Sequence, residues 1–316
     1  KHVDRKPVSV KSYANIAIVK YWGKADAERM IPSTSSISLT LENMYTETKL
    51  SFLPEDATGD VMYIDDELQE EKETIKASKV LDLFRTNPNQ HVKIETWNNM
   101  PTAAGLSSSS SGLSALVKAA NELFQVGKTQ SELAQIAKFA SGSSSRSFFG
   151  PLAAWDKDSG DVYQVETDLK LAMIMLVLTD QKKPVSSRDG MKLCTETSTS
   201  FPEWIKQSEQ DYEDMLGYLK TNDFQAVGEL TEANALRMHQ TTSTANPPFS
   251  YLTDASYQAM DKVKALRASG EQCYFTMDAG PNVKVLCLEE DLDRLADHFR
   301  KDYDVIVSRT KELPDA

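Results

Sequence analysis

Residues 101–113 read PTAAGLSSSSSGL, with five consecutive serines between Leu106 and Gly112. Without further context, a serine-rich tract is typical of a flexible linker. This tract begins after Pro101 and Gly105 and runs straight into apolar residues at helical spacing, at positions 113, 116, 117, 120, 123 and 124. We therefore predict that the serines form the N-terminus of an amphipathic helix.

A helix that starts with several hydroxyl groups is suited to an anion. Backbone N–H groups at a helix start lack partners within the helix, and the helix dipole favours negative charge there. Serine hydroxyls add donors and can ligand a Mg²⁺ ion carried by a nucleotide. The sequence does not contain GxxxxGK[ST], the signature of a P-loop. The tract thus predicts a phosphate or nucleotide site but names no reaction.

The balance of charges limits the partners. The 316 residues include 35 Lys and Arg and 47 Asp and Glu, for a formal net charge of −12. This argues against nucleic acid or an anionic membrane as main partner, although a few local cations can still bind a small anion. Three cysteines and four histidines show no spacing typical of disulfide frameworks or zinc sites. We expect reduced core thiols in a cytoplasmic protein.

Apolar runs give no sign of a membrane segment. The longest, LAMIMLVL at residues 171–178, is far shorter than the roughly 20 residues that span a bilayer. It predicts a buried strand instead. The first 30 residues contain no apolar core, so we expect no signal peptide.

The length predicts two lobes. Before the serines, short apolar segments predict strands of one sheet at residues 8–10, 16–19, 37–41, 46–52, 61–64 and 92–96. Helical periodicity then appears at residues 113–124, 129–140, 205–219, 223–239, 254–268 and 290–302. Further strands are expected at residues 272–277, 282–288 and 303–308. The polar DQKKPVSS segment places the lobe boundary near 182, which gives lobes of residues 1–182 and 183–316.

Four motifs in order resemble a known family. The serine tract, as Pro-x-x-x-Gly-Leu-x-Ser-Ser before a helix, resembles the phosphate loop of the GHMP superfamily of small-molecule kinases. The sequences ANIAIVKYWGK at 14–24, SGSSSRS at 141–147 and CYFTMDAGPNVKVL at 273–286 are similar to those of the mevalonate diphosphate decarboxylases of bacterial type. Together the resemblance covers about residues 8–308.

The resemblance implies an α/β (α+β) fold with two lobes. The N-terminal lobe would be like domain 2 of ribosomal protein S5, the C-terminal lobe would be ferredoxin-like, and the active site would lie between them. It also implies ATP-dependent decarboxylation of mevalonate 5-diphosphate to isopentenyl diphosphate, through phosphorylation of the 3-hydroxyl, with ATP and Mg²⁺ as cofactors. A homodimer is a further expectation from the family.

Two residues would then be central to the reaction. Asp278 follows a predicted strand, where an ordinary turn Asp would also fit. With the resemblance we assign it the task of accepting or orienting the proton of the 3-hydroxyl. Arg146 could by itself be a solvated surface residue, but the resemblance places it at the substrate carboxylate, which a guanidinium grips through two parallel hydrogen bonds. Ser141 and Ser143 would donate hydroxyl groups beside it.

The remaining substrate contacts come from two segments. By resemblance, Asn15 and Lys20 line the reaction centre, and Tyr21 and Lys24 reach the substrate diphosphate. Any one of them alone would be read as part of a solvated strand end. Ser187 and Arg188, just past the predicted boundary, would contact the diphosphate from the second lobe. These two residues resemble the family's second diphosphate contact, so substrate would span both lobes.

The nucleotide contacts are assigned to the serine tract. Its residues Gly105, Leu106, Ser107, Ser108 and Ser109 would hold the ATP phosphates, with Mg²⁺ near Ser108. Our hypothesis for the adenine contacts is the region around Thr96 and Asn98. The chain departs from the family pattern in that Ser107 replaces Ala or Gly and Ala140 replaces Gly, which puts loop conformation more in question than activity.

Two alternatives stay open from the residues. One is a related kinase, or a decarboxylase of the monophosphate. The other is a binding-only nucleotide sensor with the same fold. The four residues aimed at a second phosphate, Tyr21, Lys24, Ser187 and Arg188, favour the diphosphate. The pair of Asp278 and Arg146 favours an enzyme. His239 is interpreted as an ordinary helix histidine outside the catalytic set.

Overall fold

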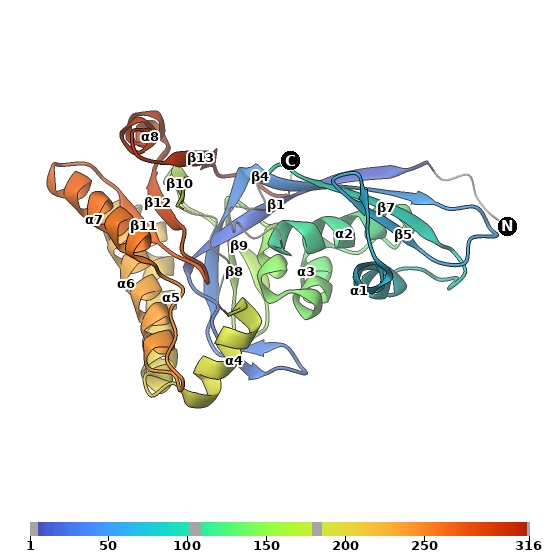
Figure 1. Cartoon of the computed structure of the whole chain (residues 1–316), viewed down its shortest axis with the longest axis horizontal. Helices are drawn as coiled ribbons and strands as arrows, with labels where there is room; N and C mark the ends of the chain where they lie inside the picture. Colours follow the sequence, from blue (N-terminus) through green and yellow to red (C-terminus); the bar gives the residue numbers. More distant parts are fainter. Residues whose placement is uncertain (1–5, 101–108, 179–184, 315–316) are drawn as a thin grey trace.

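The computed structural model describes residues 6–100, 109–178 and 185–314. They form two lobes that lie side by side along the long axis of the molecule (Figure 1). The first lobe contains a seven-stranded sheet, and the second contains a four-stranded sheet. In this part of the chain, no helix is long and apolar enough to cross a membrane.

The first sheet is built around two long antiparallel strands, β1 (Val8–Val19) and β4 (Ser36–Phe52). The other strands of this sheet are β5 (Val61–Ile64), β6 (Glu67–Leu68), β7 (Val92–Asn98), β8 (Leu152–Trp155) and β9 (Val162–Val165). Their order is β6-β5-β7-β4-β8-β9, with β1 also paired to β4. The segments predicted as four strands, 8–10 with 16–19 and 37–41 with 46–52, are thus only two strands. The register between β1 and β4 shifts after Tyr13 and after Ala17. Each shift is a bulge of the kind that adds a residue to one strand without ending the pairing.

Helices cover one face of this sheet. They are α1 (Glu71–Asp82), α2 (Ser109–Leu123) and α3 (Gln130–Ala140), followed by the 3₁₀ segment η2 (Gly142–Phe148) (Figure 1). The apolar side of α2, with Val117 and Leu123, packs with Leu50 and Ile94 of the sheet in one core cluster. The predicted helix after the serine tract is therefore confirmed. A short hairpin of β2 (Lys24–Asp26) and β3 (Ile31–Pro32) stands apart from the main sheet.

The second sheet has the order β11-β12-β10-β13 and is antiparallel throughout. Its strands are β10 (Leu171–Val177), β11 (Tyr274–Thr276), β12 (Val283–Leu288) and β13 (Asp304–Arg309). The helices of this lobe are α4 (Ser187–Thr197), α5 (Phe201–Lys220), α6 (Phe224–Ser243), α7 (Asp254–Ala268) and α8 (Leu292–Arg300), with the 3₁₀ turn η3 (Glu289–Asp291) before α8. The predicted buried strand LAMIMLVL is β10, and all three cysteines are buried and free.

Residue 182 is later than the point where the chain enters the second lobe. Strand β10, residues 171–177, already lies inside the second sheet between β12 and β13. The polar segment that suggested the boundary instead leads from β10 into α4. At its other end the chain returns to the first lobe, since Leu41 bridges Thr310 and Gly150 bridges Leu313. Division at a single residue therefore does not describe this topology.

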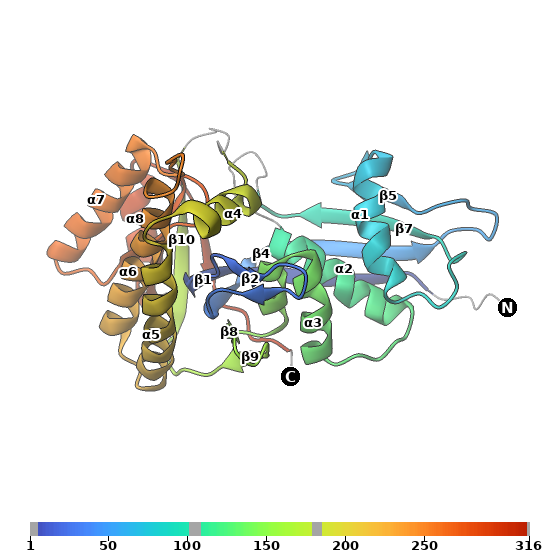
Figure 2. The same ribbon diagram turned by 90° about the horizontal axis from the view of Figure 1, so that it is seen from below.

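Two helices were not predicted. Helix α1 has the sequence EKETIKASKVLD, and only Thr74, Ala77, Val80 and Leu81 are buried. Its apolar face is too short to stand out among the charges. Helix α4 begins at the polar segment, with Ser186 as N-cap, and it contacts β2 of the first lobe. Seen from below, α4 lies between the helices of the second lobe and the β2–β3 hairpin (Figure 2).

Candidate active site

A cavity of about 660 Å³ lies between the lobes. Four parts of the first lobe line the cavity: the end of β1, the β2–β3 hairpin, the start of α2 and the turn from α3 into η2. The second lobe lines it with the start of α4, part of α6 and the segment from Asp278 to Lys284. The residues predicted for catalysis and for substrate binding all line it: Asn15, Lys20, Tyr21, Lys24, Ser141, Ser143, Arg146, Ser187, Arg188 and Asp278. Residues far apart in sequence thus meet around one space.

Asp278 lies in the turn after β11 and is held by two lysines. Lys20 Nζ is 2.8 Å from its Oδ1, and Lys284 Nζ is 2.7 Å from its Oδ2. Burial would raise the pKa of Asp278, but the two ammonium groups outweigh this and hold the pKa well below its usual range. The side chain remains 39% exposed, and Asp278 lines the cavity. Asp278 is therefore an anion fixed from both sides at the edge of the cavity.

Lys20 is buried, and burial lowers its pKa, while the charge of Asp278 opposes this. Its Nζ also donates to the carbonyl oxygen of Ala17 at 2.6 Å, and its side chain is only 2% exposed. A buried ammonium group is tolerated only where it is paired and hydrogen-bonded. Since Lys20 directly follows β1 of the first lobe and Asp278 belongs to the second lobe, this ion pair joins the lobes across the site.

Arg146 sits on η2 and is buried. Its Nε donates to the hydroxyl of Ser38, and its Nη1 donates to the hydroxyl of Ser36 at 2.7 Å. Burial lowers the pKa of Arg146 to about 10, while the charge of Asp278 opposes this, so the group is a cation at neutral pH. Ser36 and Ser38 thus accept from two of the five N–H donors of the guanidinium group. The remaining donors include both on Nη2, which can face a carboxylate.

Asn15 connects β1 to η2. Its amide nitrogen donates to the carbonyl of Ser143 at 2.9 Å and to the hydroxyl of Ser147 at 2.8 Å. Its Oδ1 is buried and accepts no hydrogen bond within the described part of the chain. A buried amide oxygen without a donor is an unusual state for a folded protein. Asn15 itself lines the cavity.

Tyr21 and Lys24 lie on the hairpin side of the cavity. The ring of Tyr21 packs against Trp155 with centroids 5.1 Å apart, and burial raises its pKa to about 12, so the phenol stays protonated. A side chain at Gly142 would meet this ring at 2.6 Å, so only glycine fits there. Burial and then the charge of Arg188 lower the pKa of Lys24. Two cations from different lobes that repel each other suit a multiply charged anion.

The phosphate loop is described only in part. Gly105, Leu106, Ser107 and Ser108 lie outside the described residues, and Ser109 is the first residue of α2. Ser110 lines the cavity and accepts a hydrogen bond of 3.4 Å from the backbone N–H of Asn15. The start of α2 is thus beside the reaction centre.

Thr96 and Asn98, the guess for adenine, do not line the cavity. The hydroxyl of Thr96 pairs with that of Thr48 at 2.8 Å, and Asn98 Oδ1 accepts from Thr46 at 2.6 Å. Both side chains thus serve the pairing of β7 with β4. No group of three or more His, Cys, Asp or Glu side chains in the described ranges could hold a metal ion.

Sequence reasoning missed several residues of the site. Lys284 was not selected, although a lysine within the otherwise apolar strand VKVLCL is a visible signal. Ser36 and Ser38 were read as strand residues, and nothing local marks them as partners of Arg146. His239, interpreted above as an ordinary helix histidine, does not line the cavity; it is 7% exposed, with Nε2 3.2 Å from the carbonyl of Met277. Burial lowers its pKa to about 4, so it is neutral.

Comparisons with known proteins agree along the whole chain. The diphosphomevalonate decarboxylase-like N-terminal domain family matches residues 12–165, and the mevalonate 5-diphosphate decarboxylase C-terminal domain family matches residues 173–313. Diphosphomevalonate decarboxylase of Candida albicans is 31% identical over 311 residues, which cover 91% of this chain and 86% of that protein.

Solved structures give the same result. Mevalonate pyrophosphate decarboxylase from Streptococcus pyogenes is 66% identical, with a TM-score of 0.96 and 100% of both chains covered. A structure described as MDDEF in complex with MVAPP, AMPPCP and magnesium is 40% identical, with a TM-score of 0.89, and the match covers 97% of this chain and 98% of that one. The two-lobe fold expected from the motifs is therefore confirmed.

Proposed function

The chain belongs to the diphosphomevalonate decarboxylase family, and from this membership we propose a role for each side chain around the cavity. The protein catalyses ATP-dependent decarboxylation of mevalonate 5-diphosphate. One observation supports these roles most directly. The anion Asp278 and cations from both lobes, among them Arg146 and Arg188, line the same cavity.

The chemistry explains why ATP is needed. Hydroxide is a poor leaving group, so the 3-hydroxyl oxygen first receives the terminal phosphoryl group of ATP, ADP is released, and the hydroxyl proton passes to solvent. The C3–O bond then breaks and releases phosphate. The bond to the carboxylate breaks with it, CO₂ leaves, and its electron pair forms the double bond of isopentenyl diphosphate. The site must bind two polyanions and tolerate positive charge that grows at C3.

Asp278 is the residue that faces this positive charge. Its carboxylate is ionised and fixed by Lys20 and Lys284. A preorganised anion stabilises a nearby developing cation without reorganising at the moment of reaction. Both oxygens of Asp278 already accept a hydrogen bond from an ammonium group, which makes the carboxylate a weak proton acceptor. We therefore assign Asp278 to orienting the 3-hydroxyl and to stabilising C3, rather than to storing the proton.

Arg146 binds the carboxylate that leaves as CO₂. Ser36 and Ser38 fix the plane of its guanidinium and leave Nη2 for the substrate. Asn15 lines the same cavity, and its amide nitrogen fixes η2 through Ser143 and Ser147. Ser141 and Ser143, whose hydroxyls are 3.1 Å apart, donate beside it. The carboxylate and the 3-hydroxyl are thereby held in one orientation.

The diphosphate is bound where the lobes meet. Lys24 of β2 and Arg188 of α4 line the same cavity, and Tyr21 and Ser187 add hydroxyl donors. A monophosphate would leave part of this charge unmatched, which favours the diphosphate over the monophosphate. Because these residues come from both lobes, bound substrate also favours closure of the lobes.

We place ATP and Mg²⁺ at the side of the cavity where α2 begins. One similar structure is described as a complex with MVAPP, AMPPCP and magnesium. In this chain, the α2 N-terminus and the hydroxyl of Ser110 lie at the cavity and suit phosphate oxygens. When bound, Mg²⁺ would neutralise charge on the triphosphate. With no carboxylate cluster to hold the ion in the described ranges, we propose that it arrives with ATP, near Ser108.

One experiment tests the function. The purified protein is supplied with ATP and with mevalonate, its 5-phosphate or its 5-diphosphate, and ADP and CO₂ are measured together. Both products from the diphosphate alone are expected. ADP without CO₂ would mean a kinase, and neither product would mean a binding-only protein.

The family also supports two further proposals, a homodimer and a cytoplasmic location. Light scattering on the purified protein measures the mass in solution, for which we expect twice that of the 35.2 kDa chain. Fractionation of cells that express it tests the location.

A further inference from the structure

Lys284 occupies an unusual place in the second sheet. In the register of β12 it lies opposite Met175 of β10 and Thr276 of β11. Its neighbours Val283 and Val285 pack in the core of the second lobe, on the opposite face of the sheet. Leu286, Met173 and Met175 pack in the cluster that the two lobes share. An ammonium group on this face needs a specific partner.

That partner is Asp278. Lys284 Nζ lies 2.7 Å from Oδ2 of Asp278, and the lysine side chain is only 8% exposed. Asp278 is 39% exposed and stays paired with Lys20, so an apolar side chain at position 284 would not leave a buried charge without a partner. The position in β12 would therefore accept an apolar side chain at little cost to folding. The presence of a charged lysine at this position therefore needs an explanation other than stability.

The two oxygens of Asp278 are divided between two lysines. Lys20, from the end of β1, takes Oδ1, and Lys284, from β12, takes Oδ2. Asp278 itself lies in a turn, closed by a hydrogen bond of 2.8 Å from Gly280 N–H to its carbonyl oxygen. With Lys20 alone, the carboxylate could still rotate about its last bond. The second lysine removes this freedom.

We propose that Lys284 is a positioning residue of the decarboxylation reaction, which holds the second oxygen of Asp278 so that the carboxylate stays ionised and aimed at C3 of the substrate. This inference rests on the proposed function. Lys284 also lines the cavity, but its ammonium group is paired with Asp278, so we assign it to act through Asp278 rather than to bind the substrate. It should therefore control kcat rather than KM.

The charges around Asp278 give this role a signature in pH. The charged and titratable groups that face Asp278 are Lys20, Lys284, Arg146 on η2 and His239 on α6. Lys20 and Lys284 hold the pKa of Asp278 well below its usual range, so the active anion persists on acidification. Without Lys284 this pKa rises. The loss of kcat on the acid side then begins at a higher pH.

The test is Lys284→Met, a side chain of similar length without charge. The diphosphate and ATP are supplied, and kcat, KM and the melting temperature are measured from acid to neutral pH. We expect kcat to fall about 10- to 100-fold, as for the loss of one charge-assisted hydrogen bond. KM for the diphosphate should change less than about 3-fold, and the acid limb of kcat should move to higher pH. The melting temperature should stay near that of the unaltered protein.

A matched control removes a lysine from an ion pair outside the cavity. Lys262 of α7 pairs with Asp302, and Lys262→Met should leave both kcat and its pH profile unchanged. Lys284→Gln, which keeps a neutral donor, is a second variant. A folded variant of Lys284 with unchanged kcat and acid limb overturns the inference. So does a rise in KM without a fall in kcat, and so does failure of both variants to fold. If the unaltered protein releases no CO₂ from the diphosphate, the proposed function fails instead.

Discussion

The side-chain oxygen of Asn234 accepts a hydrogen bond of 2.9 Å from the backbone N–H of Lys20. Asn234 lies on α6 of the second lobe, and Lys20 directly follows β1 of the first. Asn234 is in turn fixed by a hydrogen bond of 2.9 Å from its nitrogen to the buried carboxylate of Asp211, which also pairs with Arg237. The backbone of Lys20 is thus held by the lobe that carries Asp278.

Asn234→Ala should therefore weaken catalysis without touching the substrate. The buried N–H of Lys20 would lose its acceptor, which costs about 1–3 kcal/mol. We expect a lower melting temperature and a kcat reduced about tenfold. Steady-state kinetics and thermal unfolding measure both. Gln225→Ala, which removes a surface hydrogen bond to Glu229 on the same helix, is the control and should change neither.

Asp278→Asn should abolish most turnover. The substitution removes the negative charge and leaves Lys20 and Lys284 without an ionised partner. By analogy with the loss of one preorganised electrostatic group, kcat should fall about 100-fold or more. CO₂ release under saturating ATP and diphosphate measures it. Asp302→Asn, which removes the carboxylate that pairs with Lys262, is the control. Near-normal turnover of Asp278→Asn would contradict its role.

Arg146→Lys should affect the diphosphate far more than ATP. Lysine cannot reach Ser36, Ser38 and a carboxylate at once, because it has a single nitrogen. We expect kcat/KM for the diphosphate to fall about 10- to 100-fold, while the affinity for ATP measured by calorimetry stays constant. Arg267→Lys, in a pair with Glu232 that does not line the cavity, is the control. Equal losses for both ligands would argue against a carboxylate site.

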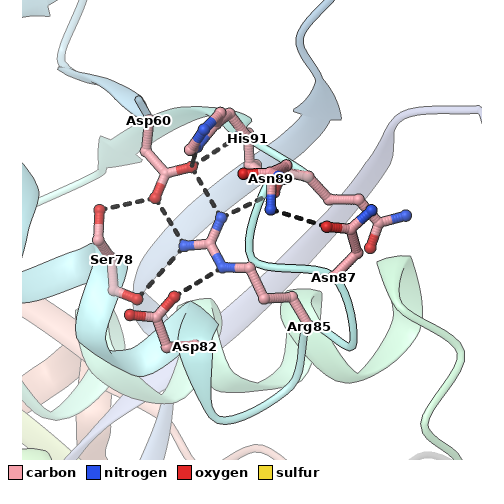
Figure 3. Close-up of polar contacts among 9 residues, drawn as sticks. Asp60, Ser78, Asp82, Arg85, Asn87, Asn89 and His91 are labelled. Atoms are coloured by element: carbon pink, nitrogen blue, oxygen red, sulfur yellow. Dashed lines mark hydrogen bonds and ion pairs between the residues drawn. The ribbon is translucent and has the colours of Figure 1, made fainter. Parts of the chain in front are cut away.

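A second buried ion pair lies far from the cavity lining, at the end of α1. Arg85 binds both oxygens of Asp60, at 3.0 and 2.7 Å, and each side chain is 3% exposed (Figure 3). The hydroxyl of Ser78 and the backbone N–H of Val92 also donate to Asp60. Burial would raise the pKa of Asp60, but these hydrogen bonds outweigh it and lower the pKa. The network ties α1 to β7.

Asp60→Asn should destabilise the protein without changing kcat. Breaking one half of a buried pair costs about 3–5 kcal/mol. Because the pKa of Asp60 is lowered on folding, its contribution is present above the unfolded value of about 3.9 and is lost as the pH falls below it. Chemical unfolding at neutral and acid pH should therefore show a smaller pH effect in the variant. Asp82→Asn, which removes a carboxylate that is 61% exposed, should have little effect on either.

How far the sequence reached can be judged from individual elements. The helix after the serine tract and α7 at 254–268 followed from helical periodicity, because each buries one face. The strand at 171–178 followed from its continuous apolar run, because both of its faces are buried. Helix α1 was not predicted, because its four buried residues stand among charged ones and give only weak helical periodicity. The lobe boundary was placed too late because the polar segment marks a connection inside the second lobe. Composition cannot show which sheet a strand will join.

The sequence by itself determined the family and the residue types around the site, since Asp278, Arg146, Lys20 and Asn15 stand in motifs with fixed local spacing. Only the tertiary structure decided the partners of these residues. Lys284 is six residues from Asp278, but Lys20 is 258 residues away and Ser36 is 110 residues from Arg146. Ion pairs and hydrogen bonds act over a few ångströms, so charge state and orientation depend on which chain segments the fold brings together.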